Sequence, residues 1–459
     1  MEKNENGGIS VDSSNNSTIT GNTINENQVN GISLSEVETT EVSRNKMNKN
    51  GIAVDSSNNV KVSRNNISDS EDSIYVGDSK NSEISYNAIS NSEGSGVSVS
   101  SSNNTKIINN NLKNNGGTGI TLDEVKDTEI NQNTINGSGS TGIEGNTVNN
   151  IKIINNTITN SSESGILISG FTDGTITKNK VSKSSEDGIN LYAGNKITVS
   201  NNTITNSHEN GIFINDVGNS NISQNNIQNS GDTGISLNNI DLFDVSNNYL
   251  NKTGEYGISF DEVPNGSITK NTIINSGSDA IFGNNFVKFK IENNTLSNLN
   301  GGGIALEEFK YVSILSNNIQ NTNLTAIRIG ESQKADIGHN TLKNNSDGIE
   351  ISNSKNSTVY NNYLDRIVNI GISLYDTETS KISNNYFKNC NYGLDLYLDR
   401  YSTVLNNTFD GNTVSIAISE SHSIDILKNI LKNSKYTGIS VFDSNNTNIR
   451  NNNLYGDLP

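Results

Sequence analysis

The sequence repeats one pattern of apolar and polar positions about every 23 residues, seen most clearly in residues 211–233. When each repeat is numbered from its opening Gly-Ile pair, apolar residues fall at positions 2, 4, 12 and 17. The chain then holds 20 repeats, nearly all of 22 or 23 residues, with one short repeat of 20 beginning at Gly31. A fixed period of this length is typical of a solenoid.

The spacing within each repeat predicts strands. Apolar or small residues at positions 2 and 4, and again at 10 and 12, alternate as the two faces of a β-strand do. Asn, Gly, Ser and Asp fill the intervals and favour turns. No repeat has a helical period, and the Leu spacing of leucine-rich repeats is missing. Three short strands per repeat predict one turn of a parallel β-helix, and the crossover rule favours a right-handed coil.

Two repeats depart from the pattern at position 4, where Gly145 and Gly283 replace the usual apolar residue. Because a core side chain is lost there, we expect the first strand to pinch or open at both places.

Position 15 is Asn in all 20 repeats, between the apolar positions 12 and 17. A primary amide has two donors and two acceptor sites. When amides are stacked about 4.8 Å apart, they can bond to their copies in the turns above and below. We therefore predict an internal asparagine ladder, which in the middle of the chain includes Asn202, Asn225, Asn248, Asn271 and Asn294.

The pattern G-I-x-[LIV], followed by [IV]-x-x-N-x-[IL], resembles the right-handed parallel β-helix repeat of the pectate-lyase-like superfamily. The resemblance runs from Gly8 to Leu454. It implies an all-β fold with a lead-in at residues 1–7, a single β-helix over residues 8–454 and a tail at residues 455–459. The superfamily includes polysaccharide lyases, glycosidases, sugar epimerases, phage tail proteins, surface adhesins and periplasmic proteins linked to copper-site assembly.

Charge narrows the range of partners. The chain has 32 Lys and Arg against 49 Asp and Glu, a net charge of −17. This balance argues against binding nucleic acid or an anionic membrane surface. No apolar run of 18 or more residues exists, so no membrane insertion is expected.

The predicted ends would leave strand edges uncovered, because the lead-in and tail are too short to cap a β-helix. The chain is therefore expected either to be a segment of a longer protein or to associate end to end or as a homo-oligomer. An extracellular or cell-surface location is expected, with any leader missing from this sequence, and a cytoplasmic one stays open.

Candidate chemistry gathers in residues 307–400. In the superfamily that the repeat resembles, outward position 3 of the first strand is the usual sugar-facing line. Glu350 and Asp395 lie on this line two turns apart, at about the upper limit for the carboxylate pair of an inverting glycosidase. These two residues are the catalytic candidates. The candidates for polysaccharide contact are Arg328, Glu350, Tyr375, Asp395 and Tyr397.

Glu307, Glu308 and Glu331 lie on adjacent repeats, where like charges could favour a bound Ca²⁺. No other cofactor is indicated, and an ordinary solvated acidic face would have the same sequence.

The sequence is compatible with two functions. Short loops and missing catalytic motifs favour a scaffold of a surface or fibre-like protein that adheres or binds carbohydrate. The charged and aromatic patch favours the alternative, a polysaccharide-processing enzyme such as a lyase, glycosidase or epimerase.

Overall fold

The computed structural model describes residues 7–27 and 29–456, which divide into two compact units between Asp232 and Thr233. Residues 1–6 of the expected lead-in and 457–459 of the expected tail lie outside the described part. Every regular element among the described residues is a β-strand. The described part of the chain holds no helix with the length and apolarity needed to cross a membrane.

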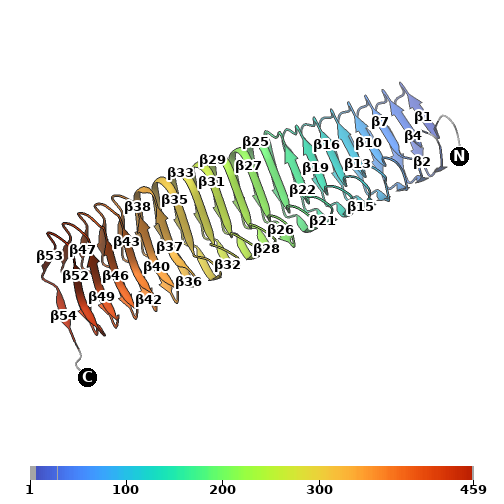
Figure 1. The fold of residues 1–459 in the computed structure, drawn as a ribbon. Helices are drawn as coiled ribbons and strands as arrows, with labels where there is room; N and C mark the ends of the chain where they lie inside the picture. Colours follow the sequence, from blue (N-terminus) through green and yellow to red (C-terminus); the bar gives the residue numbers. More distant parts are fainter. Residues whose placement is uncertain (1–6, 28, 457–459) are drawn as a thin grey trace. The chain divides into compact units, whose positions relative to one another are not determined.

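In the first unit, each turn contributes one strand to each of three sheets, and each strand pairs in parallel with its equivalents in the neighbouring turns (Figure 1). The first sheet contains β1 (Ile9–Asp12), β4 (Ile32–Ser35), β7 (Ile52–Asp55), β10 (Ile74–Gly77), β13 (Val97–Ser100), β16 (Ile120–Asp123), β19 (Ile143–Asn146) and β22 (Ile166–Ser169). The second sheet contains β2 (Thr18–Thr20), β5 (Glu41–Ser43), β8 (Lys61–Ser63), β11 (Glu83–Ser85), β14 (Lys106–Ile108), β17 (Glu129–Asn131), β20 (Ile151–Ile154) and β23 (Asp173–Thr177). The strands β25 (Ile189–Ser200) and β27 (Ile212–Ser223) belong to both sheets. The third sheet contains β3 (Thr23–Asn25), β6 (Lys46–Asn48), β9 (Asn66–Ser68), β12 (Ala88–Ser90), β15 (Asn111–Asn115), β18 (Thr134–Ser138), β21 (Thr157–Ser161), β24 (Lys180–Ser184), β26 (Thr203–Thr205) and β28 (Asn226–Ser230).

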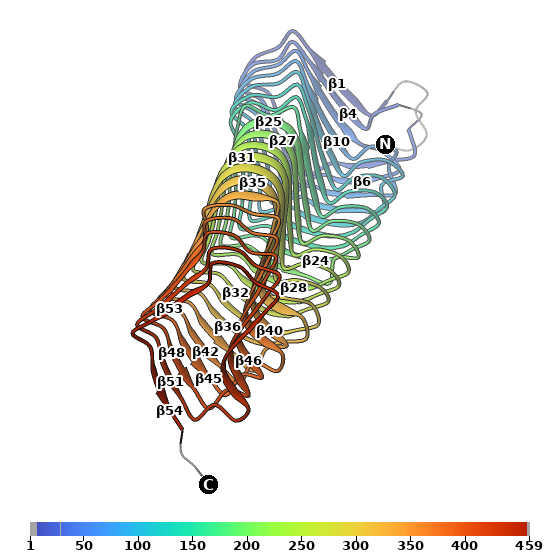
Figure 2. The ribbon, with the colours of Figure 1, turned by 60° about the vertical axis from the view of Figure 1, so that its left-hand side comes forward.

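The second unit is built in the same way, and Figure 2 shows β48, β51 and β54 of its third sheet side by side. Its first and second sheets share β29 (Ile235–Ser246), β31 (Ile258–Thr269), β33 (Ile281–Glu292) and β35 (Ile304–Leu315). The first sheet continues with β37 (Thr325–Gly330), β40 (Asp347–Ser352), β43 (Ile370–Tyr375), β46 (Tyr392–Tyr397), β49 (Val414–Ser419) and β52 (Thr437–Phe442). The second continues with β38 (Ser332–Gly338), β41 (Thr358–Tyr360), β44 (Lys381–Ser383), β47 (Thr403–Leu405), β50 (Asp425–Leu427) and β53 (Asn448–Arg450). The third sheet contains β30 (Tyr249–Thr253), β32 (Thr272–Ser276), β34 (Thr295–Leu299), β36 (Asn318–Thr322), β39 (Thr341–Lys343), β42 (Tyr363–Asp365), β45 (Tyr386–Lys388), β48 (Thr408–Asp410), β51 (Ile430–Lys432) and β54 (Asn453–Tyr455).

The predicted all-β, right-handed parallel β-helix is confirmed. Its core is formed by the apolar residues of the repeat: Ile212, Ile214, Ile222 and Ile227, at positions 2, 4, 12 and 17 of one turn, are each 0% exposed. One turn therefore buries a narrow apolar core that it completes only with its neighbours.

The corner between the first and second sheets has two forms. At Ser57, position 7, the backbone N–H donates to the hydroxyl of Ser79 in the next turn at 3.1 Å, and the two strands of that turn stay separate. In β25, β27, β29, β31, β33 and β35 the chain instead runs through the corner as one 12-residue strand, where three separate strands per turn were predicted. None of these six turns has a hydroxyl at position 7, where Val217, for example, is buried. Val125 also occupies position 7 in a turn with separate strands, so an apolar corner permits the continuous strand without requiring it.

The predicted pinch or opening at the two position-4 glycines is not seen. Gly145 and Gly283 both stay paired in register with the residues of adjacent turns. A Cβ on Gly283 would overlap the ring of Phe260 in the preceding turn, and one on Gly145 would meet Ile168 Cδ1 at 2.9 Å. A larger neighbour therefore fills the space that each missing side chain leaves.

Many of the asparagines outside position 15 have a left-handed backbone conformation. Asn201 and Asn206, at repeat positions 14 and 19, have φ angles of 56° and 57°. Asn tolerates this conformation better than most residues because its short side chain can bond locally. The asparagines therefore have two separate roles, one at the bends and one at position 15 in the interior.

The interior asparagines at position 15 form a ladder of saturated amides. Asn202 Nδ2 donates to Asn225 Oδ1 at 3.0 Å and to the carbonyl of Ile176 at 2.9 Å. Its Oδ1 accepts from the backbone N–H of Asn179 at 2.9 Å and from Asn179 Nδ2 at 3.1 Å. Both donors and both acceptor sites of this buried amide are used.

In the second unit, the same pair of bonds joins Asn248 to Asn271 and Asn271 to Asn294, at 2.9–3.1 Å. The short repeat keeps the ladder too, because Asn45 donates to Asn65 Oδ1 at 3.0 Å across a separation of 20 residues. The ladder therefore holds the register even where the repeat length changes.

One corner position holds a buried carboxylate where equivalent turns have Ser. Asp399 lies at position 7, is 0% exposed, and accepts hydrogen bonds from Thr377 Oγ1 at 2.5 Å and Ser402 Oγ at 2.9 Å. Its Oδ2 has no hydrogen-bond partner among the described residues. Burial is the largest influence, and it raises the pKa of Asp399 to about 6.

We expect Asn202→Leu to lower the free energy of unfolding by more than about 2 kcal/mol, because each buried polar group left unpaired costs about 1–3 kcal/mol. Asn179 would lose its acceptor and the carbonyl of Ile176 its donor. Urea unfolding followed by circular dichroism measures the difference. Thr203→Val, next to the ladder but outside it, is the control and should change stability by less than about 1 kcal/mol. Equal stability of Asn202→Leu and the wild type would contradict the ladder's role.

A second prediction concerns pH. Because the folded pKa of Asp399 lies above the ordinary value of 3.8, ionisation disfavours the folded state as pH rises from about 4 to about 6. Asp399→Asn removes this titration and should gain up to about 3 kcal/mol over the wild type at pH 7, but little at pH 4. Unfolding curves at several pH values measure the gain. Asp376→Asn, at an exposed carboxylate of the preceding turn, is the control. A gain that did not depend on pH would contradict the assignment.

Candidate functional site

The outward line of the first sheet in the second unit is formed by the position-3 residues of successive turns. Strand alternation buries Ile349 and Ile351 and turns Glu350 outward. Pairing in register places Arg328 beside Glu350, then Ser373, then Asp395. Adjacent strands are about 4.8 Å apart, so the backbones of Glu350 and Asp395 are about 10 Å apart. The structure therefore brings these predicted residues onto one face.

Arg328 and Glu350 are held by neighbouring side chains. Arg328 Nη1 lies 2.5 Å from Glu307 Oε1, and both side chains are about 40% exposed. Glu350 Oε2 accepts a hydrogen bond from Thr325 Oγ1 at 3.3 Å. Glu307, at position 5 of the preceding turn, therefore balances the charge of the Arg328 guanidinium. The hydrogen bond from Thr325 orients the Glu350 carboxylate on the surface of the sheet.

Two tyrosines border this line at position 5. Tyr375 and Tyr397 are paired in register, and their ring centroids lie 5.5 Å apart with the planes at 34°. The pKa of Tyr397 is raised, first by the negative charge of Glu420. Beside them, burial raises the pKa of Asp395 above its ordinary value. Asp395 therefore holds its proton to a higher pH than an exposed aspartate does.

The three glutamates predicted to hold Ca²⁺ point to two different places. Glu307 pairs with Arg328, whereas Glu308 and Glu331 lie along a groove at the corner. Among the described residues, no group of three His, Cys, Asp or Glu side chains is arranged to hold a metal ion. The calcium site stays a prediction, and the pairing of Glu307 does not favour it.

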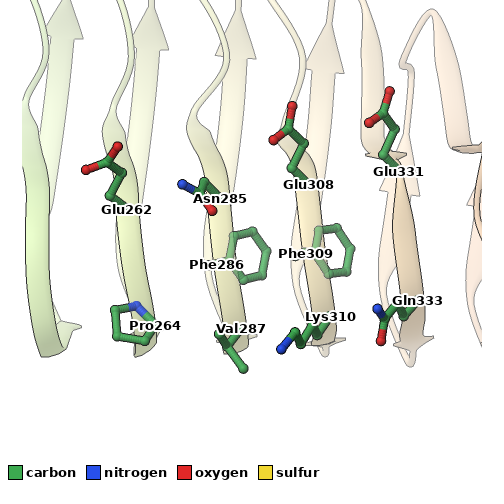
Figure 3. Close-up of a pocket in the computed structure, with 10 residues that line it drawn as sticks. All are labelled: Glu262, Pro264, Asn285, Phe286, Val287, Glu308, Phe309, Lys310, Glu331 and Gln333. Atoms are coloured by element: carbon green, nitrogen blue, oxygen red, sulfur yellow. The ribbon is translucent and has the colours of Figure 1, made fainter.

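Figure 3 shows the groove, which has a volume of about 780 Å³ and follows the corner over four turns. Its floor is formed by the stacked rings of Phe286 and Phe309, 4.6 Å apart and each only 4% exposed. One rim is formed by the position-6 residues Glu262, Asn285, Glu308 and Glu331. The other rim is formed by the position-8 residues Pro264, Val287, Lys310 and Gln333. Sequence reasoning identified only Glu308 and Glu331 here. The sequence signal that could have indicated the groove is the pair of Phe residues at position 7 of two consecutive repeats.

A second aromatic pair was also missed. The rings of Tyr256 and Phe282 stack at 4.9 Å and 21° at the edge of the first sheet. Burial, followed by the charges of Asp279 and Glu255, raises the pKa of Tyr256. Phe282 is position 3 of the repeat that begins at residue 280, whereas Tyr256 is the last position of the repeat that ends just before Gly257, so numbering by repeat places two touching residues two repeats apart.

The family model for the right-handed β-helix region matches residues 7–144, 141–286, 279–429 and 379–457. Among solved structures, the periplasmic alginate epimerase AlgG is 12% identical with a TM-score of 0.41, covering 70% of this chain and 75% of that chain. The mannuronan C-5 epimerase AlgE6 A-module of Azotobacter vinelandii is 12% identical, with a TM-score of 0.30 and coverage of 84% and 91%. PfbA, a surface adhesin of Streptococcus pneumoniae, is 12% identical, with a TM-score of 0.25 and coverage of 82% and 85%.

No curated protein sequence matches the chain significantly. The assignment to a family therefore rests on the family model and on the parallel pairing of successive turns. Because the overlapping matches cover nearly the whole sequence, the chain belongs to the right-handed β-helix family.

Proposed function

We propose that this chain is a β-helix scaffold that binds polysaccharide on the outward first sheet of its second unit, as an adhesive or carbohydrate-binding module of a surface or fibre-like protein. The observation that carries the proposal is the line Arg328, Glu350, Ser373 and Asp395, which strand pairing places side by side, bordered by Tyr375 and Tyr397.

The chemistry of this face suits hydroxyl-rich ligands. Carboxylates accept and guanidinium groups donate strong hydrogen bonds, and exposed tyrosine rings offer apolar surface with a polar tip. The equivalent line of the first unit is plainer. It carries one carboxylate, Glu144, and no cation among Ser10, Ser33, Ala53, Tyr75, Ser98, Thr121, Glu144, Leu167, Asn190 and Phe213. The second unit is therefore the better candidate.

The mode of binding follows from the sheet. Each of β37, β40, β43 and β46 is paired on both sides, so within the described residues this face has no free strand edge to which a peptide could add. A ligand on this face must be recognised by side chains. The net charge of −17 repels polyanions, which favours neutral glycans. An extracellular or cell-surface location suits such a partner.

A polysaccharide-processing enzyme is the second candidate, because burial raises the pKa of Asp395, as a general acid requires. Glu350 would be its partner. The two residues lie two strands apart, so their backbones are separated by about 10 Å. The two carboxyl groups of an inverting enzyme are about 6.5–9.5 Å apart, which is close to this spacing. Ser373 lies between them and leaves room above the sheet.

The test is affinity electrophoresis of the chain against neutral and uronate polysaccharides, with and without Ca²⁺, with products read by mass spectrometry. We expect retention by a neutral glycan without products, and affinity at least about tenfold weaker for Glu350→Gln. Glu144→Gln is the matched control, because its position and its bond from Thr118 repeat those of Glu350. It should bind as the wild type does.

The other outcomes are also informative. Products that disappear in Glu350→Gln and Asp395→Asn would make the chain an enzyme. Neither retention nor products with any glycan would refute both proposals. Retention that required Ca²⁺, and that was lost in Glu308→Gln and Glu331→Gln, would support the predicted calcium site.

A further inference from the structure

A notch interrupts the outward face of the first sheet at position 5, beside the proposed glycan-binding line. Position 5 is occupied in successive turns by Glu307, Gly330, Ser352, Tyr375 and Tyr397. A Cβ on Gly330 would have only Glu307 Cγ at 3.6 Å and Ser352 Oγ at 3.9 Å within 4 Å. Two small residues thus leave open space between the larger side chains of Glu307 and Tyr375.

One wall of the notch is aromatic. The ring of Tyr375 lies against Tyr397 on one side, and on the other side its neighbour in the sheet is Ser352. The side chain of Ser352 is too small to cover the ring, and Tyr375 is 46% exposed. The ring therefore offers apolar surface to whatever stands over Ser352.

The other sides of the notch are polar. Arg328 and Glu350 lie two residues before Gly330 and Ser352 on the same strands, so they project from the same face of the sheet. Glu307, which closes the far end, is paired with Arg328. The notch is thus bounded by an aromatic ring, an ion pair that still has unused donors, and the Glu350 carboxylate.

We propose that this notch binds a single pyranose ring of a neutral polysaccharide, with the apolar side of the sugar against Tyr375 and its hydroxyls bonded to Glu350 and Arg328. The inference rests on the proposed function and specifies its principal subsite. Glu307 and Tyr375 lie three strands apart, so their backbones are separated by about 14 Å. This distance leaves room for one sugar ring between the two side chains. The charges of Glu307, Arg328 and Glu350 sum to −1, so a uronate would be repelled.

The experiment fills the notch without disturbing the residues that bound it. Gly330→Leu adds a side chain where nothing lies closer than 3.6 Å, and the backbone there is not left-handed, so the variant should fold. Ser419→Leu is the matched control, because it adds a side chain at position 5 on the far side of Tyr397. Tyr375→Ala removes the aromatic wall. The probes are the hexasaccharides of cellulose, xylan, mannan and amylose, with oligogalacturonate as the anionic comparison.

With the neutral probe that binds the wild type most tightly, calorimetry should show affinity at least about tenfold weaker for Gly330→Leu and for Tyr375→Ala. Ser419→Leu should stay within about twofold of the wild type. Saturation transfer from the tyrosine rings to one sugar residue of the probe should be seen for the wild type and lost in Tyr375→Ala.

The failures can be told apart. If neither the neutral probes nor oligogalacturonate binds the wild type, the proposed function fails and the notch fails with it. If a probe binds and Gly330→Leu binds it equally well, the notch is refuted while the proposed function stands. Tighter binding of oligogalacturonate than of the neutral probes would refute the assigned ligand class.

Discussion

The rest of the structure depends on the hydrogen bonds of the position-15 asparagines. A buried amide is costly unless both donors and both acceptor sites are used. Asn202 uses all of them: three bonds join it to Asn179 and Ile176 of the preceding turn, and one joins it to Asn225 of the following turn. Because each amide is bonded on both sides to the equivalent Asn one strand step away, the ladder helps to set which residues of neighbouring turns lie side by side. The outward lines of side chains inherit that register.

Because the register depends on the asparagine ladder, the fold could be predicted from the sequence. Position 15 is Asn in every repeat, and the apolar positions around it keep fixed distances, so strand pairing could be predicted before any coordinates. The short repeat at Gly31 was no obstacle, because the ladder bond from Asn45 to Asn65 is kept. Features that depend on neighbouring turns were not readable. Gly283 looked like a gap because the ring of Phe260 that fills it comes from the preceding repeat.

The same distinction separates what could be predicted of the candidate site from what could not. The line through Arg328, Glu350 and Asp395 follows from repeat position alone. The partner of Arg328 does not, because a long side chain crosses from position 3 to position 5 and reaches Glu307. The raised pKa of Asp395 depends in the same way on how the surrounding side chains bury it. Repeat numbering gives the location of a residue, whereas its chemistry depends on contacts between different positions.

In a scaffold this regular, function is best sought where the sequence departs from its own pattern. Small polar residues are the rule at outward position 5, and a uniform column of them gives one turn no advantage over another as a binding place. Tyr192 and Phe442 break the rule singly, whereas Glu307, Tyr375 and Tyr397 break it within five turns of one another, and Gly330 leaves the space between them open. Neither departure improves the core, because all of these side chains project outward from paired strands. These side chains contact one another rather than the apolar core, and they lie beside the single Arg of the position-3 line, which is why the proposed ligand is placed there.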